Sequence, residues 1–204
     1  MTIEQRTAVP TDAQIRALHE RHAPTEAAFH LVWTHCRIVC EVAEQLLERH
    51  GAGLDVALVR AGSLLHDIGV YRLHDAAGRF DRANYVRHGV LGHALLRESG
   101  LPETLGRFCS RHTGVGLTRE DVLRQRLPLP VADWTPVTDE EVLVMYADKF
   151  HSKTTPPTFV TAASYSAAVR RFGADKVARF AALVERFGEP DLEVLARRRG
   201  HPVG

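Results

Sequence analysis

Signals that start helices recur along the whole chain, and this regularity most constrains how such a sequence can fold. In each signal a threonine hydroxyl stands three residues before a polar or acidic side chain, which is the spacing of a capping box. The alternating apolar and polar runs that mark strands are missing. We therefore expect an all-α fold. The three capping boxes pair Thr11 with Gln14, Thr118 with Asp121, and Thr138 with Glu141.

The spacing of apolar residues gives the expected helices. The longest runs from about residue 25 to residue 50, where Ala28, Val32, Val39 and Val42 recur on one side. Neither an internal repeat nor a linker interrupts the pattern, so we expect one helical bundle of about nine helices. Beyond a helix started at Thr11, further helices are expected at about 55–66, 85–98, 102–112, 119–126, 138–150, 162–172, 174–187 and 192–199.

Composition excludes several classes of protein. The 204 residues carry 26 Lys and Arg against 25 Asp and Glu, which argues against a general nucleic-acid binder. A chain of this length can form a core without a structural metal or disulfides, and its three cysteines form no CxxC pair. No long uncharged apolar run predicts a membrane span. We therefore expect a cytoplasmic protein. The unusual feature of its composition is the number of histidines, 12 in 204 residues.

Four of the residues that could bind a metal interrupt apolar helices. His66 and Asp67 lie at the end of an apolar helix, in the sequence LLHDIG, while His35 interrupts the stripe of the longest helix and Asp148 interrupts VLVMYADKF. A buried carboxylate needs a partner, and a cation is a natural one. Taken singly, each has a structural explanation, such as a hydrogen-bonded core histidine or an ion pair at a helix end. The adjacent pair His74-Asp75 lies in a polar loop without an apolar scaffold, so we give it less weight.

This ordered set resembles the signature of the HD-domain superfamily of metal-dependent phosphohydrolases. The matching residues are His35, His66-Asp67 and Asp148, and the resemblance runs from about residue 30 to residue 155. It implies a helical bundle around a metal site. We accordingly divide the chain into an N-terminal helix with its lead-in (1–24), an HD metal-binding core (25–155) and C-terminal helices packed on the same domain (156–204).

Many members of the superfamily add two histidines that bind a second metal, and His88 and His112 fit that pattern here. His93 competes with His88, but five helical residues turn the two about 140° apart, so both cannot face one site. We prefer His88, which lies near the start of its helix. Ordinary surface histidines remain the alternative for His88 and His112.

The resemblance implies the ligand sets and the cofactors. One metal would take His35, His66, Asp67 and Asp148, while a second would take His88 and His112, with Asp67 shared. Imidazole mixed with carboxylate suits two divalent transition metals, iron or manganese first and cobalt, nickel or zinc as alternatives, better than magnesium or calcium. Two such cations, about 3.5–4 Å apart, would activate a bridging water as hydroxide and neutralise charge on phosphoryl oxygens.

Basic residues next to these ligands are the candidates for substrate contacts. Asp67 and Lys149 are the expected catalytic residues, and Lys149, Lys153, Arg111 and His151 are the expected substrate-binding residues. Each of the last four has the alternative of a solvated surface charge. Loops near residues 72–84, 127–136 and 152–158 are the expected rim, and Tyr71, Tyr85 and Trp134 are aromatic candidates for stacking on a substrate ring.

The leading prediction is a phosphomonoesterase or phosphodiesterase that acts on a small phosphorylated metabolite or nucleotide. The first alternative is a mixed-valence diiron oxygenase, since myo-inositol oxygenase has a similar six-ligand helical site. The absence of tyrosine from residues 20–34 favours hydrolysis over that alternative. The second alternative is a non-catalytic nucleotide sensor. We expect a monomer or homodimer with no membrane and no nucleic-acid polymer as partner.

Overall fold

The computed structural model describes residues 9–75 and 77–204 and confirms the all-α fold. The expected lead-in at residues 1–8, and residue 76 of the expected rim loop, lie outside the described residues. The α-helices of the described part are α1 (Asp12–His22), α2 (Glu26–His50), α3 (Val56–Leu65), α4 (His88–Glu98), α5 (Glu103–Ser110), α6 (Arg119–Arg124), α7 (Asp139–Ala147), α8 (Ala162–Val169), α9 (Ala174–Phe187) and α10 (Leu192–Arg199).

Threonine side chains cap the helices that the capping boxes predict. At Thr11 and Thr118 both halves of the box form, so each hydroxyl and its partner side chain bind the other residue's backbone N–H. At Thr138 only the hydroxyl half forms, because the Glu141 carboxylate accepts hydrogen bonds from Arg107 (2.6 Å) and from the Val137 N–H (2.9 Å). Thr138 still starts α7, since one cap satisfies one of the free N–H groups of a first turn.

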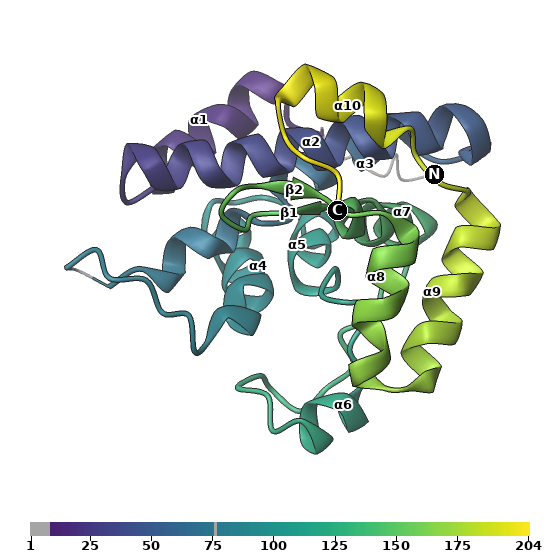
Figure 1. Cartoon of the computed structure of the whole chain (residues 1–204). Coiled ribbons are helices and arrows are strands. Elements are labelled where there is room, and N and C mark those ends of the chain that lie inside the picture. The colour runs from purple at the N-terminus through teal and green to yellow at the C-terminus, as the bar shows by residue number, and fades with distance from the viewer. Residues whose placement is uncertain (1–8, 76) are drawn as a thin grey trace, which may run out of the picture.

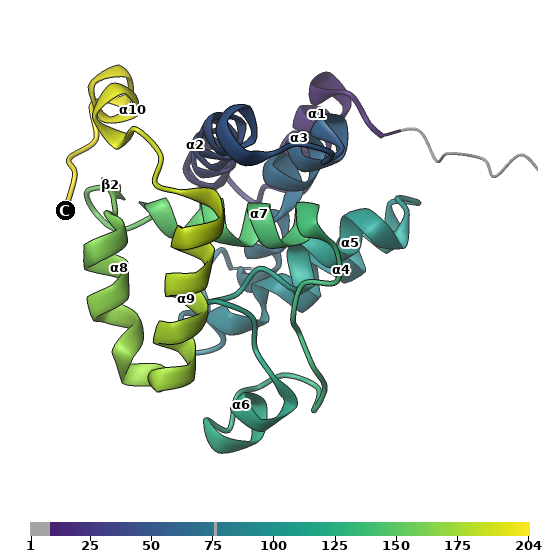
Figure 2. The ribbon, with the colours of Figure 1, turned by 90° about the vertical axis from the view of Figure 1, so that its right-hand side faces the viewer.

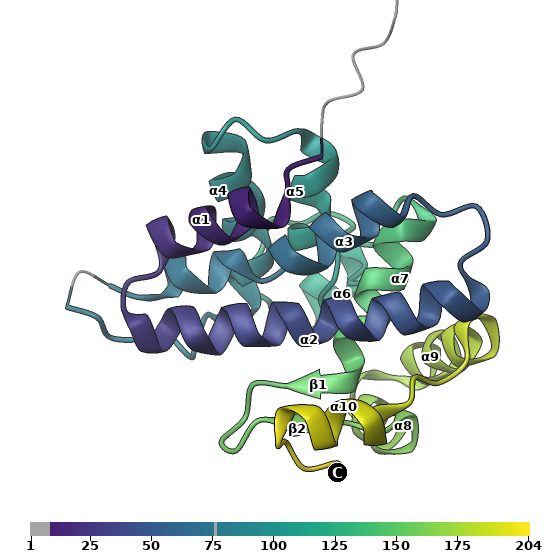
Figure 3. The same ribbon diagram turned by 90° about the horizontal axis from the view of Figure 1, so that it is seen from above.

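Helix α2 is the central element of the fold. Seen from above, α1 and α10 lie on opposite sides of it (Figure 3), and it also packs on α3 and α7. Its buried side includes Val32, Val39, Val42 and Leu46, none of which is exposed to solvent. A helix of 25 residues therefore spans the molecule and places the side chains at its midpoint inside the core.

Short 3₁₀ helices continue several of the α-helices. The turn η1 (Ile68–Leu73) follows α3, η2 (Tyr85–Arg87) leads into α4, η3 (Asp148–Phe150) follows α7, and η4 (Arg170–Phe172) follows α8. The apolar pattern does not separate a 3₁₀ turn from the adjoining α-helix, because both bury residues at similar spacing. The segments expected as single helices at 138–150 and 162–172 are therefore each divided in two.

The C-terminal third folds back onto α2. Helices α8 and α9 form a hairpin on one side of the molecule, and α10 returns across the top (Figures 1 and 2). Glu41 of α2 pairs with Arg199 of α10, which holds the last helix in place.

The proline-rich segment after α7 is a small hairpin, whereas the sequence predicted only a loop. Strand β1 (His151–Ser152) pairs with β2 (Thr158–Phe159) in antiparallel register, and Phe159 also bridges to Val203. Strands of two residues are too short to show an alternating pattern, so only the pairing itself reveals them. Across the described ranges, the structure has no helix that is both long and apolar enough to cross a membrane.

Candidate metal centre

The six expected ligands converge on one buried point between five elements. Asp67 and His66 lie where α3 meets η1, Asp148 begins η3, His88 begins α4, and His112 follows α5. These five lie at helix boundaries, where the chain changes direction. His35 is the exception because it projects from the middle of α2. The four histidines and Asp67 are 0–4% exposed, so the centre is buried.

The ligand atoms fall into two groups that share Asp67. In the first, the His35 Nε2 lies 3.0 Å from Asp148 Oδ1 and 3.3 Å from Asp67 Oδ2. The His66 Nε2 completes this group, 3.2 Å from the His35 Nε2 and 3.4 Å from Asp148 Oδ1. In the second, Asp67 Oδ1 faces the Nε2 atoms of His88 (3.3 Å) and His112 (3.5 Å), which are 3.0 Å apart.

These distances fit divalent cations. Atoms that bind one ion at about 2.1 Å lie about 3.0–3.4 Å from each other in octahedral or tetrahedral geometry. The Asp67 Oδ1 is buried and has no hydrogen-bond partner among the described residues, although it faces two imidazole nitrogens. Without a donor, a carboxylate oxygen and nitrogen lone pairs at this distance repel one another, and a cation between them removes the repulsion.

Backbone carbonyls orient three of the four imidazoles. The Nδ1 atoms of His66, His88 and His112 donate to the carbonyls of Ser63, Tyr85 and Cys109, each at 2.7 Å. A neutral imidazole that donates through Nδ1 has its lone pair on Nε2, the atom that faces the centre. Burial lowers the pKa of His88 to about 4 and also lowers the pKa of His112, so both rings are neutral at pH 7. The rings of His88 and His112 are therefore in the neutral form that binds a metal.

Two lysines balance the negative charges of Asp67 and Asp148. The Lys153 ammonium pairs with Asp67 Oδ2, and Lys149 donates to Asp148 Oδ2 (2.6 Å) and to the His112 carbonyl (3.0 Å). Burial alone would raise the pKa of Asp67, but the Lys153 charge and the surrounding imidazoles hold it well below its ordinary value. Both carboxylates are consequently ionised, as metal ligands must be.

A pocket of about 160 Å³ opens onto the second ligand group. Asp67, His88 and His112 line this pocket, together with Lys149 and Lys153. This is a small site whose two ammonium groups balance its two carboxylates, with the phenol ring of Tyr85 in its lining. The complete lining is Asp67, Tyr85, His88, His112, Thr113, Gly114, Asp148, Lys149 and Lys153.

The structure places the other expected substrate groups away from this pocket. The Arg111 guanidinium donates to the Thr135 carbonyl (2.7 Å), because the chain after α5 turns that side chain toward the loop before α7. His151 lies behind the centre, where its Nδ1 is 2.9 Å from the His35 Nδ1. Arg111 and His151 are therefore not positioned to contact a substrate in this pocket.

Among the aromatic candidates, only Tyr85 lines the pocket. Tyr71 is buried and contacts His19, while the Trp134 indole donates to the Pro130 carbonyl. Thr113 and Gly114, the two residues after the candidate ligand His112, also line the pocket and were not predicted from the sequence. Neither carries a charge or a ligand atom that a pattern would reveal.

The competing histidines have other partners. His93 binds the Ser110 hydroxyl and Glu103, each at 2.9 Å, on the side of α4 away from the centre. His74 packs on Phe80, and Asp75 pairs with Arg79 at the surface. The structure thus brings His88, and neither His93 nor the His74-Asp75 pair, to Asp67.

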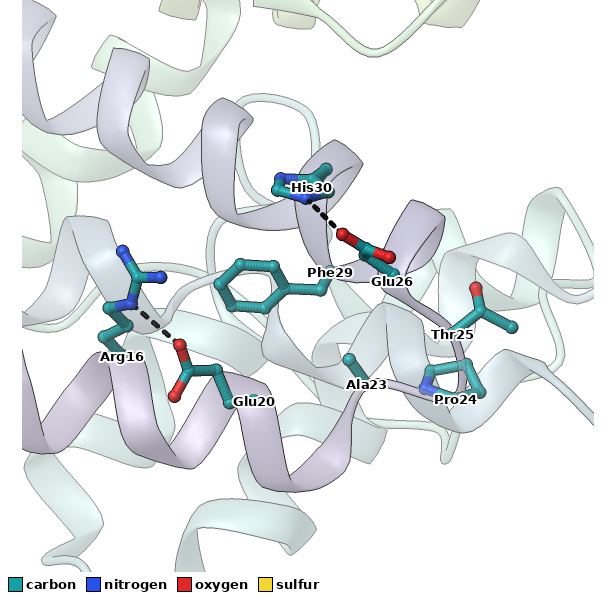
Figure 4. Close-up of a pocket in the computed structure, with 8 residues that line it drawn as sticks. All are labelled: Arg16, Glu20, Ala23, Pro24, Thr25, Glu26, Phe29 and His30. Atoms are coloured by element: carbon teal, nitrogen blue, oxygen red, sulfur yellow. Dashed lines mark hydrogen bonds and ion pairs between the residues drawn. The ribbon is translucent and has the colours of Figure 1, made fainter.

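A second, open depression lies where α1 turns into α2 (Figure 4). Its polar side chains pair with each other, Arg16 with Glu20 at 2.8 Å and His30 with Glu26 at 3.4 Å, on either side of Phe29. Both potential metal-binding groups found among the described residues lie at the centre around Asp67 instead. We therefore assign the candidate site to that centre.

The chain belongs to the HD-domain family, whose model matches residues 32–153. This confirms the family that the sequence resembles. Three of the six candidate ligands, His66, Asp67 and Asp148, lie in the two segments, LLHDIG and YADK, that suggested the family.

Two relatives are similar in sequence to this chain, but their similarity does not assign a function to it. An uncharacterized protein of Methanocaldococcus jannaschii is 41% identical over 117 residues, covering 56% of this chain and 62% of its own length. The tRNA (cytidine(56)-2'-O)-methyltransferase of Picrophilus torridus is 34% identical over 128 residues, covering 63% of this chain and 33% of its own length. The chain therefore spans less than two thirds of either relative.

Among solved structures, the chain is similar to the HD domain of the phosphodiesterase PgpH from L. monocytogenes in complex with cyclic-di-AMP. The sequence identity is 15% and the TM-score is 0.49, with 86% of this chain and 98% of that chain covered.

Proposed function

We propose that this protein is a metal-dependent phosphohydrolase, a phosphomonoesterase or phosphodiesterase for a small phosphorylated metabolite or nucleotide. Membership of the HD-domain family supports this proposal at the level of the superfamily. The observation that carries it further is the position of Asp67. Its two oxygens face two separate groups of imidazole nitrogens, and Oδ1 has no other partner among the described residues.

The proposed ligands divide as the two groups do. His35, His66 and Asp148 would hold one cation, His88 and His112 the other, and Asp67 would bind both. A pair of divalent cations supplies Lewis acidity, which lowers the pKa of water and neutralises negative charge on phosphoryl oxygens. Iron or manganese is the proposed metal, because the donor set combines imidazoles with carboxylates and contains no thiolate.

Lysine side chains at the pocket would bind the phosphate. Lys149 is fixed by Asp148 and the His112 carbonyl, so its ammonium is oriented before a substrate arrives. Lys153 pairs with Asp67, and a cation bound by Asp67 would free this ammonium for a phosphate oxygen. The pocket of about 160 Å³ holds a phosphoryl group better than a whole nucleotide, so the rest of a larger substrate would extend past Tyr85.

Replacing Asp67 tests the proposal. Asp67→Asn keeps the side-chain shape but removes the shared charge, so we expect the protein to lose both metals and its phosphatase activity. The measurements are metal content by elemental analysis and phosphate release from a panel of mono- and diesters with added Mn²⁺ or Fe²⁺. Asp75→Asn, at an exposed carboxylate outside the centre, is the matched control.

The two alternative functions predict different results when the protein is loaded with metal. Oxygen consumption with reduced iron, without phosphate release, would identify an oxygenase. A nucleotide that binds tightly and remains intact with every divalent metal would identify a sensor. Full activity in Asp67→Asn would contradict the proposed centre altogether.

A further inference from the structure

One ligand histidine is oriented differently from the other three. The Nδ1 atoms of His66, His88 and His112 donate to carbonyls three residues earlier in their own segments. The Nδ1 of His35 instead lies 2.9 Å from the Nδ1 of His151, a residue 116 positions away. The orientation of this ring in the middle of α2 therefore depends on tertiary structure.

The contact continues to the C-terminal segment. The Nε2 of His151 lies 3.1 Å from the Nδ1 of His201, and the rings of His35, His151 and His201 form a stack with centroids 5.2 and 5.3 Å apart. His151 is 5% exposed, whereas His201 is half-buried. The three imidazoles form a row from the metal centre toward solvent.

Backbone hydrogen bonds hold His201 in this position. Phe159 of β2 donates to the Pro202 carbonyl (2.8 Å) and accepts from the Gly204 N–H (2.9 Å). Thr161 donates to the Gly204 carbonyl (3.1 Å). Residues 201–204 are thus hydrogen-bonded to the hairpin that carries His151 and Lys153. The position of His201 is therefore fixed relative to His151.

We propose that His151 and His201 are positioning residues of the metal centre, which fix the ring and tautomer of His35. The inference rests on the proposed function, because it requires His35 to bind a cation through Nε2. That binding leaves the proton on Nδ1, which donates to His151 Nδ1. His151 must then carry its proton on Nε2 and donate to His201 Nδ1, so one ligation event sets all three tautomers.

The reverse direction is incompatible with ligation. If His151 donated to His35, the His35 proton would lie on Nε2, which faces the Asp148 carboxylate at 3.0 Å and the metal position. When its own proton lies on Nε2, His201 accepts the His151 Nε2–H through Nδ1 and so completes the productive direction. Partners of this kind outside the ligand set raise metal affinity by roughly 10–100-fold.

Two substitutions of His201 separate its hydrogen bond from its packing. His201→Phe keeps a ring stacked on His151 but removes the acceptor nitrogen. His201→Asn loses the ring but keeps an acceptor oxygen near the position of Nδ1. Calorimetric titration of the metal-free protein with Mn²⁺ measures each affinity, and the visible spectrum of the Co²⁺ form reports the ligand geometry directly.

We expect His201→Phe to weaken one of two Mn²⁺ sites about 10-fold or more, to alter the Co²⁺ spectrum and to leave the other site unchanged. His201→Asn should restore the native affinity and spectrum. His201→Leu, a second variant without an acceptor, should behave like His201→Phe. His30→Ala, which removes an exposed imidazole from the same helix as His35, controls for adventitious binding, and circular dichroism checks the fold of each metal-free variant.

The outcomes distinguish this inference from the proposed function. Native affinities and an unchanged Co²⁺ spectrum in folded His201→Phe would overturn the inference alone. Equal weakening in His201→Phe and His201→Asn would also overturn it, because packing would then be the cause. A native protein that binds no Mn²⁺ or Co²⁺ would overturn the proposed function, and this inference with it.

Discussion

Burial lowers the pKa of several histidines in this protein, because a low-dielectric interior disfavours the protonated ring. His19 is a clear example outside the metal centre. It is fully buried between α1 and α3, with its Nε2 2.8 Å from the Leu64 carbonyl and its Nδ1 2.9 Å from the Tyr71 hydroxyl. Burial lowers its pKa to about 4. The ring therefore donates to Leu64 and accepts from Tyr71 as a neutral side chain.

This pKa predicts a dependence of stability on pH. Between pH 6.5 and 4 the unfolded chain protonates His19 while the folded chain does not, so the stability is complete above pH 6.5 and falls as the pH drops toward 4. One pKa unit corresponds to about 1.4 kcal/mol, so His19 should remove about 2 kcal/mol between pH 7.5 and pH 5. Urea unfolding of the metal-free protein at both pH values measures the loss.

His19→Gln isolates this contribution. Glutamine can donate to the Leu64 carbonyl and accept from Tyr71, but it does not titrate. We expect its loss of stability between pH 7.5 and pH 5 to be smaller than the native loss by about 2 kcal/mol. Equal losses in the two proteins would show that His19 is not the group responsible.

At the scale of elements, a close approach between η1 and α4 brings His88 to Asp67. A Cβ on Gly69 would lie 2.0 Å from the His88 carbonyl oxygen and 2.2 Å from the Gly92 nitrogen. Both neighbours are backbone atoms, which cannot rotate away. The glycine of LLHDIG thus sets the distance between the two helices that supply Asp67 and His88.

Gly69→Ala should separate these two elements. We expect a loss of about 1–3 kcal/mol in unfolding free energy, together with a loss of the metal bound by His88 and His112. Urea unfolding and metal content measure the two effects. Gly106→Ala is the matched control, because its Cβ would meet the His93 ring, a side chain that can move. A Gly69→Ala protein with native stability and two metals would contradict this role of the glycine.

At the scale of the whole molecule, a buried ion pair joins segments that contribute nothing to the centre. Lys176 of α9 pairs with Asp121 of α6 and donates to the Gly116 carbonyl (3.2 Å), and both charged residues are 2–3% exposed. Asp121 also accepts from the Thr118 N–H and hydroxyl, each at 2.9 Å. The pair fixes α6 and its flanking loops against the α8–α9 hairpin.

Lys176→Met should leave Asp121 Oδ2 without its buried cation, because the remaining cationic partner, Arg124, is exposed and pairs with Oδ1 at 2.7 Å. We expect the unfolding free energy to fall by about 3 kcal/mol. The double variant Lys176→Met with Asp121→Asn removes the uncompensated charge and retains the cap, so it should recover part of the loss. Chemical unfolding measures both, and unchanged Mn²⁺ affinity shows that the effect is confined to this region. Native stability in the single variant would contradict the prediction.

Local interactions made most helices predictable. Capping threonines and apolar spacing depend on residues three or four positions apart, so the sequence indicated where α1, α2, α6 and α9 begin. The hairpin at His151 was not predictable from such signals, since its pairing partners are Thr158 and Phe159 across a turn and Val203 at the chain end. Its short strands exist because distant segments supply the hydrogen bonds.

The sequence by itself determined the all-α class, the HD-domain family and the residue types of the candidate centre, because these follow from short-range spacing and from recognisable segments such as LLHDIG and YADK. Only the tertiary structure decided that Arg111 and His151 lie outside the pocket, that His88 rather than His93 faces Asp67, and that His201 contacts His151. Those outcomes depend on tertiary packing, which brings together side chains such as His151 and His201, 50 residues apart, or His35 and His151, 116 residues apart, and fixes which ring nitrogen meets which partner.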